Sequence, residues 1–336
     1  MSSKELALAL QGGGSHGAYT WGVLDRLLED ERMEIEGMSG ASAGAMNAVV
    51  LADGYTAGGR DGARAALSRF WGSVSDKLGH NGLAAASAVP VPDPTARAYL
   101  FLTRFFSPYQ LNPLNVNPLR DIVSEQVDFE RLRSACRMKL YISATRVSDG
   151  ALKIFPREEL TVAAVLASAC LPAIHHSVEV DGVAYWDGGL TANPPLSVLL
   201  HKCGARDLLV VALNPQGSEK VPSTAEAIAE RLSQINFSST LSAELQAIAL
   251  AKAEAERSRF SFGRIDRRLK RLNVHLIDSA QYMATLGPAS RYNTDSGFIG
   301  ALHDEGRASA DAWLKRNFRS IGTRSTFALG ALLPQP

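Results

Sequence analysis

The sequence contains little cysteine. Only three of its 336 residues are cysteines, Cys136, Cys170 and Cys203, and they lie far apart in the chain. An odd number of widely spaced cysteines excludes a disulfide framework. Their spacing also fits no metal-binding pattern, so we expect no cysteine-bound metal.

Neither sign of charge dominates the composition. Lys and Arg number 35 against 34 Asp and Glu, which argues against a general nucleic-acid-binding protein because such proteins are usually strongly basic. Hydrophobic residues make up 46% and charged residues 21%, so the chain is not disordered and is rich enough in apolar residues for a large core. Because we find no repeat and no linker, we expect one large domain over residues 1–336.

Long hydrophobic runs are also missing. The longest uncharged apolar stretch, residues 161–174, is too short to span a bilayer and contains Pro172. The first ten residues lack a basic region followed by a long apolar run, so we do not expect them to form a signal peptide. We therefore expect a cytoplasmic protein.

The remaining pattern is typical of a parallel sheet wrapped by helices. The expected strands lie at residues 5–10, 33–38, 138–144, 151–155, 207–213 and 272–277, with a hairpin over 177–186 that turns at Asp181-Gly182. The expected helices lie at residues 18–28, 43–51, 60–77, 158–169, 223–259 and 300–318. We expect the helix from residue 43 to close at Asp53-Gly54, and Asn193 to cap a helix that starts with two prolines.

One segment interrupts this pattern. Residues 78–117 contain repeated prolines and predict a lid-like insertion. Within it, we expect the aromatic segment 99–109 to pack on the core, with contact to a lipid surface as the alternative. Residues 223–336 are expected to be mainly helical, with a basic cluster at 264–271 that we interpret as a solvated helix face rather than a site for anionic lipids.

A Gly-x-Ser-x-Gly sequence, Gly40-Ala-Ser42-Ala-Gly44, lies where a strand is expected to end and a helix to begin. Small neighbours allow the sharp turn that exposes a nucleophilic serine, and the N-terminus of the following helix favours developing negative charge. The motif alone also fits an ordinary turn that packs a helix tightly on a sheet.

A glycine-rich loop from Gly12 to Gly17 follows the first expected strand. Its successive backbone N–H groups are suited to binding an anion. One candidate anion is the pyrophosphate of a nucleotide, with Glu36 near the place of a ribose-binding acid. The other is the oxyanion of an acyl-transfer intermediate. A nucleotide-binding fold does not need the serine turn, so the two motifs together favour a serine hydrolase.

A third motif, Tyr185-Trp-Asp187-Gly-Gly189, follows a strand-like run. A carboxylate in such a sharp turn can approach another loop closely and act as general base for the Ser42 hydroxyl. An ordinary Asp-Gly turn is the alternative.

Together these motifs resemble the patatin-like phospholipase family. The glycine-rich loop, the Gly-x-Ser-x-Gly turn and the Asp-Gly-Gly turn occur in the family's order, and the stretches 167–172 and 187–195 are similar as well. The resemblance covers about residues 6–213. It implies a three-layer α/β/α fold with a mainly parallel central sheet.

The resemblance also implies a chemistry. Ser42 is the expected nucleophile and Asp187 the expected base of a Ser-Asp dyad that hydrolyses fatty-acyl esters of lipids through an acyl-serine, without cofactor or metal. The oxyanion hole is expected in the backbone of the glycine loop, at Gly12, Gly13, Gly14 and Ser15. The expected partner is a lipid ester, with peripheral contact to a membrane surface as a further alternative. Three other functions stay open: a nucleotide-binding protein, a Ser-Asp-His esterase, and a non-catalytic lipid-binding scaffold.

The sequence differs from the family's pattern at several histidines. The family commonly has Arg or Lys where His16 stands, and we expect His16 to pack the loop rather than to carry charge. Where the family often has Phe and Pro, this chain has His175 and His176, which alters the expected acyl pocket. These two are the main rivals for a triad role, whereas His275 and His303 are expected to be structural.

Overall fold

The fold is built around one sheet. The computed structural model describes residues 3–79, 102–103, 105–214, 221–258, 263–286 and 288–333. Within these residues eight strands form the sheet. The strands are β1 (Lys4–Leu10), β2 (Met33–Gly40), β3 (Lys139–Arg146), β4 (Leu152–Pro156), β5 (Val178–Val180), β6 (Val183–Asp187), β7 (Asp207–Ala212) and β8 (Asn273–Asp278).

Most neighbouring strands are parallel. The order across the sheet is β5-β6-β3-β2-β1-β7-β8, and β4 pairs with β3 as an additional strand. Strands β3, β2, β1, β7 and β8 run parallel, whereas β4, β5 and β6 are paired antiparallel. The expectation of a mainly parallel sheet is confirmed. The carboxyl ends of β1 and β2 consequently meet at one edge, where the loops that follow them lie together.

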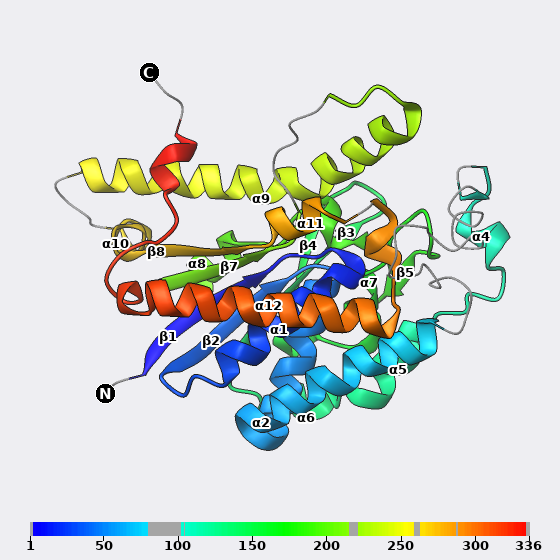
Figure 1. Ribbon diagram of the computed structural model, residues 1–336, viewed down its shortest axis with the longest axis horizontal. Helices are drawn as coiled ribbons and strands as arrows, with labels where there is room; N and C mark the ends of the chain where they lie inside the picture. Colours follow the sequence, from blue (N-terminus) through cyan, green and yellow to red (C-terminus); the bar gives the residue numbers. More distant parts are fainter. Residues whose placement is uncertain are drawn as a thin grey trace.

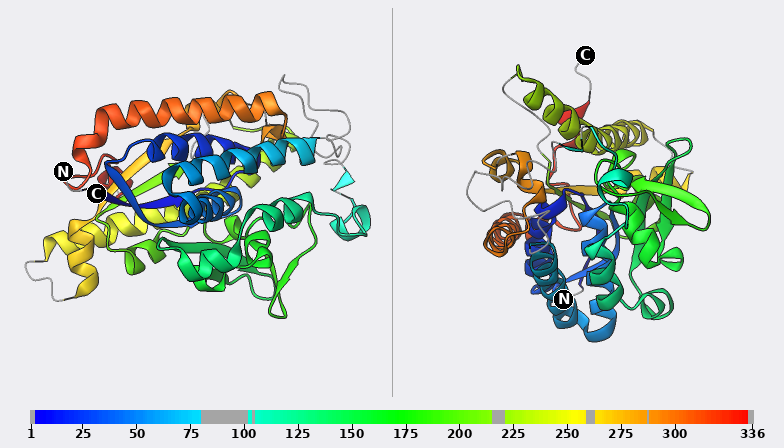
Figure 2. Two further views of the ribbon diagram at one scale, coloured as in Figure 1. Left: turned by 90° about the horizontal axis from the view of Figure 1, so that it is seen from below. Right: turned by 90° about the vertical axis from the view of Figure 1, so that its right-hand side faces the viewer.

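Helices cover both faces of this sheet (Figures 1 and 2). The described α-helices are α1 (Gly17–Leu28), α2 (Ala43–Gly79), α4 (Pro108–Leu111), α5 (Pro118–Gln126), α6 (Phe129–Ala135), α7 (Val162–Ser168), α8 (Ser197–Lys202), α9 (Ala225–Arg257), α10 (Arg264–Arg271), α11 (Ala280–Ala284) and α12 (Ser296–Asn317). Two short 3-10 helices matter for the site, η1 (Gly14–His16) and η4 (Pro288–Tyr292).

Side chains of the central strands alternate between two hydrophobic clusters. In β1, Leu6, Leu8 and Leu10 belong to the cluster that includes α1, α2 and α12. Ala7 and Ala9 belong to the cluster that includes α8 and α9. This period of two is the reason that a continuous apolar run forms a strand buried on both faces. The expected three-layer α/β/α fold is therefore confirmed.

Helices α1 and α12 lie side by side across one face of the sheet (Figure 1). They approach closely at two glycines, because a Cβ atom on Gly22 would overlap the carbonyl oxygen of His303 and one on Gly306 would overlap that of Tyr19. The C-terminal helix therefore packs directly on the helix that follows the glycine-rich loop.

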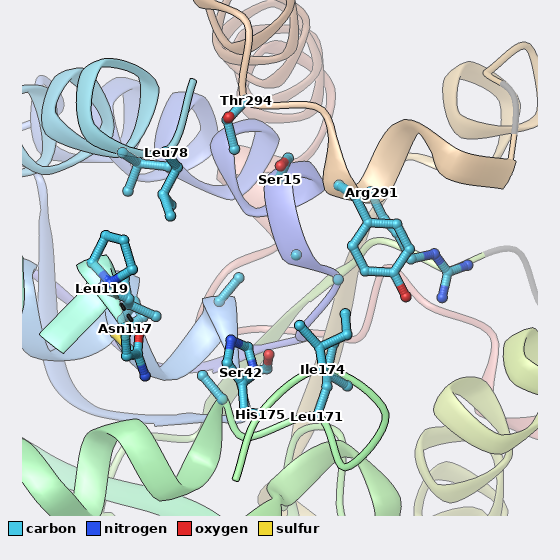
Figure 3. Close-up of a pocket in the computed structure, with 18 of the residues that line it drawn as sticks. Ser15, Ser42, Leu78, Asn117, Leu119, Leu171, Ile174, His175, Arg291 and Thr294 are labelled. Atoms are coloured by element: carbon cyan, nitrogen blue, oxygen red, sulfur yellow. Dashed lines mark hydrogen bonds between the residues drawn. The ribbon is translucent and has the colours of Figure 1, made fainter. Parts of the chain in front are cut away.

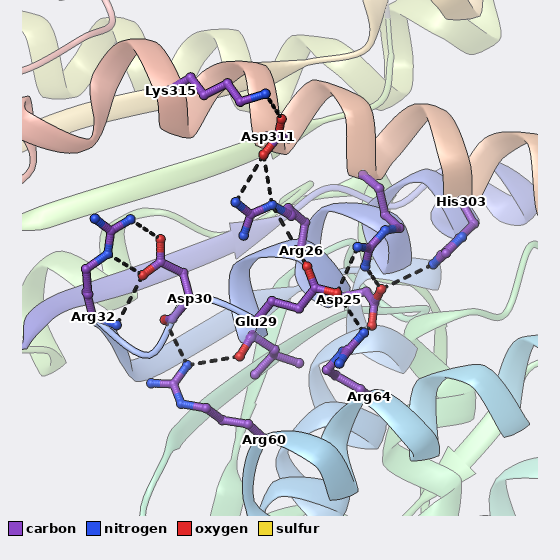
Figure 4. Close-up of polar contacts among 12 residues, drawn as sticks. Asp25, Arg26, Glu29, Asp30, Arg32, Arg60, Arg64, His303, Asp311 and Lys315 are labelled. Carbon is purple, nitrogen blue, oxygen red and sulfur yellow. Dashed lines mark hydrogen bonds and ion pairs between the residues drawn. The ribbon is translucent and has the colours of Figure 1, made fainter.

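A charge cluster joins α1 and α12 to α2 (Figure 4). We define it as Asp25, Glu29, Arg64, His303 and Arg307. The Asp25 carboxylate pairs with Arg64 at 2.7 Å, with His303 at 3.6 Å and also with Arg307. Glu29 pairs with Arg64 and Arg307 at 2.8 Å each. Each charge in the cluster faces an opposite charge, and the structural role expected for His303 is confirmed.

Helix α2 does not end where the sequence suggested. The expectation of a turn at Asp53-Gly54 was wrong, since both residues are helical and the break comes later, at Gly58 and Gly59. Asp53 is buried and its carboxylate binds the guanidinium of Arg131 at 2.7 Å. Gly54 allows close packing instead of a turn, because a Cβ there would lie 2.6 Å from the Cβ of Ala66.

The hairpin prediction was correct, but the cap prediction at Asn193 was wrong. Asp181 and Gly182 have φ angles of 51° and 77°, as a tight hairpin turn between β5 and β6 requires. Helix α8 begins only at Ser197 and its N-cap is Leu196. Asn193 lies before the helix, and its side chain is buried in contact with the glycine-rich loop.

The aromatic segment does not pack on the core as expected. Part of residues 99–109, and most of the lid-like insertion 78–117, lie outside the described residues. Of the described part, Phe105, Phe106 and Tyr109 are 68%, 45% and 54% exposed.

The basic cluster on α10 is more than a solvated helix face. Arg268 donates to the carbonyl oxygens of Gly204 and Ala205 at 2.8 and 2.7 Å, and Lys270 donates to that of Ser258 at 2.7 Å. The cluster therefore attaches α10 to neighbouring loops. No helix among the described residues is both long and apolar enough to cross a membrane.

Candidate active site

Ser42 occupies a strained turn between strand β2 and helix α2. Its φ angle is 52°, in the left-handed region that a non-glycine residue rarely adopts. The neighbouring glycines make this turn possible, because a Cβ on Gly40 would lie 2.6 Å from the carbonyl carbon of Gly44. A Cβ on Gly44 would in turn overlap the carbonyl oxygen of Leu10. The strand-turn-helix setting predicted for the motif is thus present.

Ser168 holds the backbone of Ser42 by hydrogen bonds. Its N–H donates to the carbonyl oxygen of Ser168 at 3.1 Å and to the Ser168 hydroxyl at 3.0 Å. The N-terminus of α2 begins at the next residue, so its backbone dipole favours negative charge beside Ser42. The Ser42 side chain lies at the lining of a cavity.

Asp187 lies at the end of β6 and is completely buried. Its backbone N–H donates to the carbonyl oxygen of Cys170 at 2.8 Å, and its carbonyl oxygen accepts from the Thr145 hydroxyl at 2.8 Å. Oδ1 accepts from the N–H of Gly189 at 2.7 Å. These contacts fix the carboxyl group in one orientation.

The second carboxyl oxygen of Asp187 is available for chemistry. Oδ2 is buried and has no hydrogen-bond partner of normal geometry among the described residues. Burial raises the pKa of Asp187 to about 7, although the Gly189 N–H and the nearby Ser42 hydroxyl both lower it. Ser42 therefore lies close enough to the Asp187 carboxyl group to lower its pKa, and catalytic hydrogen bonds often tighten only when substrate binds.

The glycine-rich loop touches Ser42. A Cβ on Gly12 would lie 2.8 Å from the Cβ of Ser42. Gly13, Gly14 and Ser15 line the same cavity as Ser42, and their backbone N–H groups donate no hydrogen bond to the rest of the described chain. The N–H of Gly12 differs, since it donates to Asn193 Oδ1 at 2.7 Å and is not available to an oxyanion.

Three amide side chains hold this loop, and sequence reasoning missed all of them. Asn193 contacts Gly12 and donates to the carbonyl oxygen of Phe237 on α9 at 2.9 Å. Asn214 donates to the carbonyl oxygen of Gly12 at 3.1 Å, and Gln11 accepts from the N–H of Asn214 at 3.0 Å. The partners lie about 180 to 230 residues away from the loop in sequence, so no local pattern indicates them.

His16 is a packing residue, as expected. It is buried, and its Nε2 lies 2.8 Å from the Ser290 hydroxyl of η4. Burial and the positive charge of Arg291 lower the pKa of His16 to about 3, so the ring is neutral at ordinary pH.

Among the rival histidines, His175 alone lies in the cavity lining that the structure describes. Its Nδ1 is buried without a hydrogen-bond partner among the described residues, and burial together with His176 lowers its pKa to about 4. His176 instead packs on the ring of Tyr109, 4.1 Å away. His275 pairs with Asp207 at 2.8 Å inside the sheet, which confirms its structural role. No described histidine binds the Asp187 carboxylate, the contact that a Ser-Asp-His triad needs.

The cavity beside Ser42 has a volume of about 250 Å³ and is mostly apolar. Side chains of α2 and α5 supply much of its apolar lining, among them Met46, Phe70, Val74, Leu78 and Leu119, and Leu171, Ile174 and Phe237 add to it. Figure 3 shows Leu78 and Leu119 on one side of Ser42 and Arg291 on the other. A long apolar group would therefore fit on the α2 and α5 side of Ser42.

We next consider whether the described residues could hold a metal ion or a nucleotide. Within the described residues, no group of three or more His, Cys, Asp or Glu side chains is arranged to hold a metal ion. Glu36, the candidate ribose-binding acid, is already engaged: it pairs with Lys139 at 2.7 Å and accepts from the backbone N–H of Gly204 at 2.7 Å. That arrangement speaks against a nucleotide site built on Glu36.

The family can be assigned from the sequence. A family model described as patatin-like phospholipase matches residues 8–200, more than half of the chain. The chain belongs to the patatin-like phospholipase family. This match contains the glycine-rich loop, Ser42 and Asp187, and it ends before α9.

Individual relatives are distant. An uncharacterized protein of Escherichia coli K12, YjjU, is 25% identical over 217 residues, which are 62% of this chain and 52% of that protein. This chain thus spans about half the length of that curated relative.

Solved structures are similar at low identity. VipD of Legionella pneumophila is 14% identical with a TM-score of 0.44, and the similarity covers 93% of this chain and 67% of VipD. The ExoU-SpcU complex of Pseudomonas aeruginosa contains a chain 17% identical with a TM-score of 0.34, covering 94% of this chain and 76% of that one.

Proposed function

We propose that this protein is a serine acyl-hydrolase that cleaves fatty-acyl esters of lipids with a Ser42-Asp187 dyad. The observation that carries the proposal is a buried Asp187, whose Oδ2 has no hydrogen-bond partner in the part of the chain that the structure describes, together with a strained Ser42 at an apolar cavity. Membership of a phospholipase family supports a lipid ester as substrate.

The first half of the proposed reaction acylates the serine. Asp187 Oδ2 takes the proton of the Ser42 hydroxyl while Oγ bonds to the ester carbonyl carbon. The oxyanion that forms accepts hydrogen bonds from the N–H groups of Gly13, Gly14 and Ser15. When the intermediate collapses, the carbon–oxygen bond to the alcohol breaks, and the alcohol leaves with the proton held by Asp187.

The second half releases the fatty acid. A water molecule attacks the acyl-serine while Asp187 takes its proton, and the intermediate collapses to free acid and the restored Ser42 hydroxyl. One carboxyl group thus accepts and returns a proton twice. A pKa of about 7 suits this double duty, because both protonation states are populated near neutral pH.

A second part of the proposal concerns how lipid reaches the site. Exposed apolar side chains gather on residues 105–116, among them Phe105, Leu114 and Val116, which are 68%, 84% and 62% exposed. Asn112 and Val116 of this segment also line the cavity. We propose that this segment makes peripheral contact with a lipid surface, so that substrate can enter the cavity from the bilayer.

A fluorophosphonate probe tests the dyad function directly. We expect the probe to modify Ser42 of the wild-type protein and to leave Ser42→Ala unmodified. Ser233→Ala is the matched control, because Ser233 also lines the cavity but takes no part in the proposed chemistry. Labelling that survives in Ser42→Ala, or no labelling and no ester hydrolysis by the wild type, would overturn the proposal.

A further inference from the structure

The cavity has one cation, Arg291, that the dyad chemistry does not use. It lies in η4, near the start of the C-terminal helix and outside the residues matched by the family. Its carbonyl oxygen packs against the glycine-rich loop so closely that a Cβ on Gly14 would overlap it. The position of Arg291 is therefore fixed relative to the loop that surrounds the reacting ester.

The guanidinium of Arg291 has no counter-charge among the described residues. Arg291 is only partly buried and is one of the residues that line the cavity, and none of the described carboxylates forms an ion pair with it. This contrasts with the buried or half-buried arginines of the charge cluster, which are all paired. A partly desolvated cation beside a cavity is stabilised when an anion binds there.

The described lining of the cavity also contains an unsatisfied hydroxyl group. Thr294 lines the same cavity, and its buried hydroxyl has no hydrogen-bond partner among the described residues. Ser15 lies on the same wall, across Ser42 from His175, Leu171 and Ile174 (Figure 3). The side at Leu78 and Leu119 is thus apolar, whereas the side at Arg291 combines this cation with apolar side chains such as Leu171 and Ile174 (Figure 3).

The arrangement matches the two ends of a phospholipid. In Figure 3, Ser42 lies between the apolar side at Leu78 and Leu119 and the side at Arg291. An ester bound at Ser42 with its acyl chain toward the apolar side directs the rest of the lipid toward Arg291. In a phospholipid that part carries a phosphate, and the planar guanidinium is suited to bind phosphate oxygens in a bidentate manner.

We infer that Arg291 binds the phosphate group of a phospholipid substrate and makes the enzyme prefer phospholipids over neutral acylglycerols. This inference rests on the proposed function and adds a substrate class to it. Arg291 is a specificity residue in this account, and it takes no part in proton transfer. Free phosphate and a phospholipid headgroup present the same phosphate oxygens to Arg291. The experiments must therefore distinguish these two ligands.

The first test compares two substrates with the same acyl chains in mixed micelles of a neutral detergent, diacyl phosphatidylglycerol and diacylglycerol. We expect Arg291→Gln to lower the ratio of their kcat/KM values by about tenfold or more, because a charge-assisted contact with the phosphate is lost. Arg291→Lys should restore part of the ratio, and added salt should reduce the wild-type preference. Arg316→Gln, which removes an exposed charge near the far end of α12, should leave the ratio unchanged.

The second test does not depend on turnover. In a Ser42→Ala background, Arg291→Gln should weaken binding of a dialkyl-ether phosphatidylglycerol and leave binding of the dialkyl-ether glycerol within a factor of two. Equal weakening of both ligands, or none, would overturn the inference, as would Arg291-dependent binding of inorganic phosphate that competes with the ether phospholipid at equal affinity. If the wild type cleaves neither ester, the proposed function fails, while ether-lipid binding still decides the role of Arg291.

Discussion

The candidate site and the charge cluster differ in whether their polar groups have partners. In the charge cluster each carboxylate of α1 meets arginines from α2 and α12 (Figure 4). At the site, Asp187 Oδ2, His175 Nδ1 and the Thr294 hydroxyl are buried without partners in the described part of the chain. Buried polar groups without partners lower stability, so they are kept where a ligand or a reaction needs them.

This difference separates the two kinds of residue experimentally. Substitutions of the proposed dyad should reduce activity and leave the free energy of unfolding unchanged or slightly higher. Substitutions in the charge cluster should lower the free energy of unfolding and leave the activity of the folded protein unchanged. The predictions below follow this contrast from the largest expected effect to the smallest.

Asp187→Asn should abolish most activity without unfolding the protein. The amide has nearly the same shape but cannot accept the Ser42 proton, so we expect kcat to fall by about a thousandfold or more. Thermal unfolding should occur at the wild-type temperature or above, because a buried ionisable group is removed. Asp181→Asn, in the exposed turn between β5 and β6, is the control. Wild-type kcat in Asp187→Asn would remove the dyad from the account.

Asp25→Asn should have the opposite signature. Asp25 is buried and is the shared partner of Arg64 and Arg307, whose side chains are 34% and 29% exposed. Since partly exposed arginines regain hydration, we expect a loss of about 2 kcal/mol in the free energy of unfolding. Denaturant titration measures this loss, and kcat of the folded fraction should stay at the wild-type value. Asp61→Asn, an exposed position of α2, should change neither quantity.

Asn193→Ala tests the support of the glycine-rich loop. The substitution removes the partner of the Gly12 N–H and one of the side-chain donors to the Phe237 carbonyl oxygen, which keeps its contact with Gln11. We expect the rate of fluorophosphonate labelling at Ser42 to fall by about tenfold, because the donors of the oxyanion hole lose their fixed position. Asn236→Ala, on an exposed face of α9, should label at the wild-type rate. Equal rates for both variants would mean that the loop needs no such support.

His175→Phe should have the smallest effect. A general base contributes about 10²-fold to 10⁴-fold, so a change in kcat below tenfold would be consistent with a dyad. The variant also removes a buried ring nitrogen that has no partner among the described residues, and it should therefore unfold at the same temperature or higher. Loss of turnover in a folded His175→Phe protein would instead favour a triad.

Much of the fold follows from local pattern. The period of two in Leu6, Leu8 and Leu10, and the strand-turn-helix setting of Ser42, depend on short-range sterics that a sequence displays. The turn prediction at Asp53-Gly54 was wrong because glycine also allows close packing of helices. Only the position of Ala66 in the folded chain distinguishes the two uses.

The supports of the site could not be predicted in the same way. Asn193 has the composition of a helix cap, and its contact with Gly12 spans 181 residues. Arg291 reaches the glycine-rich loop through η4, which follows the part of the chain that carries the family motifs. Such contacts depend on how α9 and α12 pack on the sheet, and packing of that range has no signature in a single sequence.

The central claim is that Asp187 is the base that activates Ser42, and the pH dependence of labelling at Ser42 tests it most directly. Burial raises the pKa of Asp187 to about 7 and only the ionised carboxylate can take the Ser42 proton, so the account predicts a labelling rate that rises with pH through a single transition near 7 and then levels. Asp187→Asn should show a low rate without this transition. A rate that is already maximal near pH 5, or the same transition in Asp187→Asn, would contradict the account.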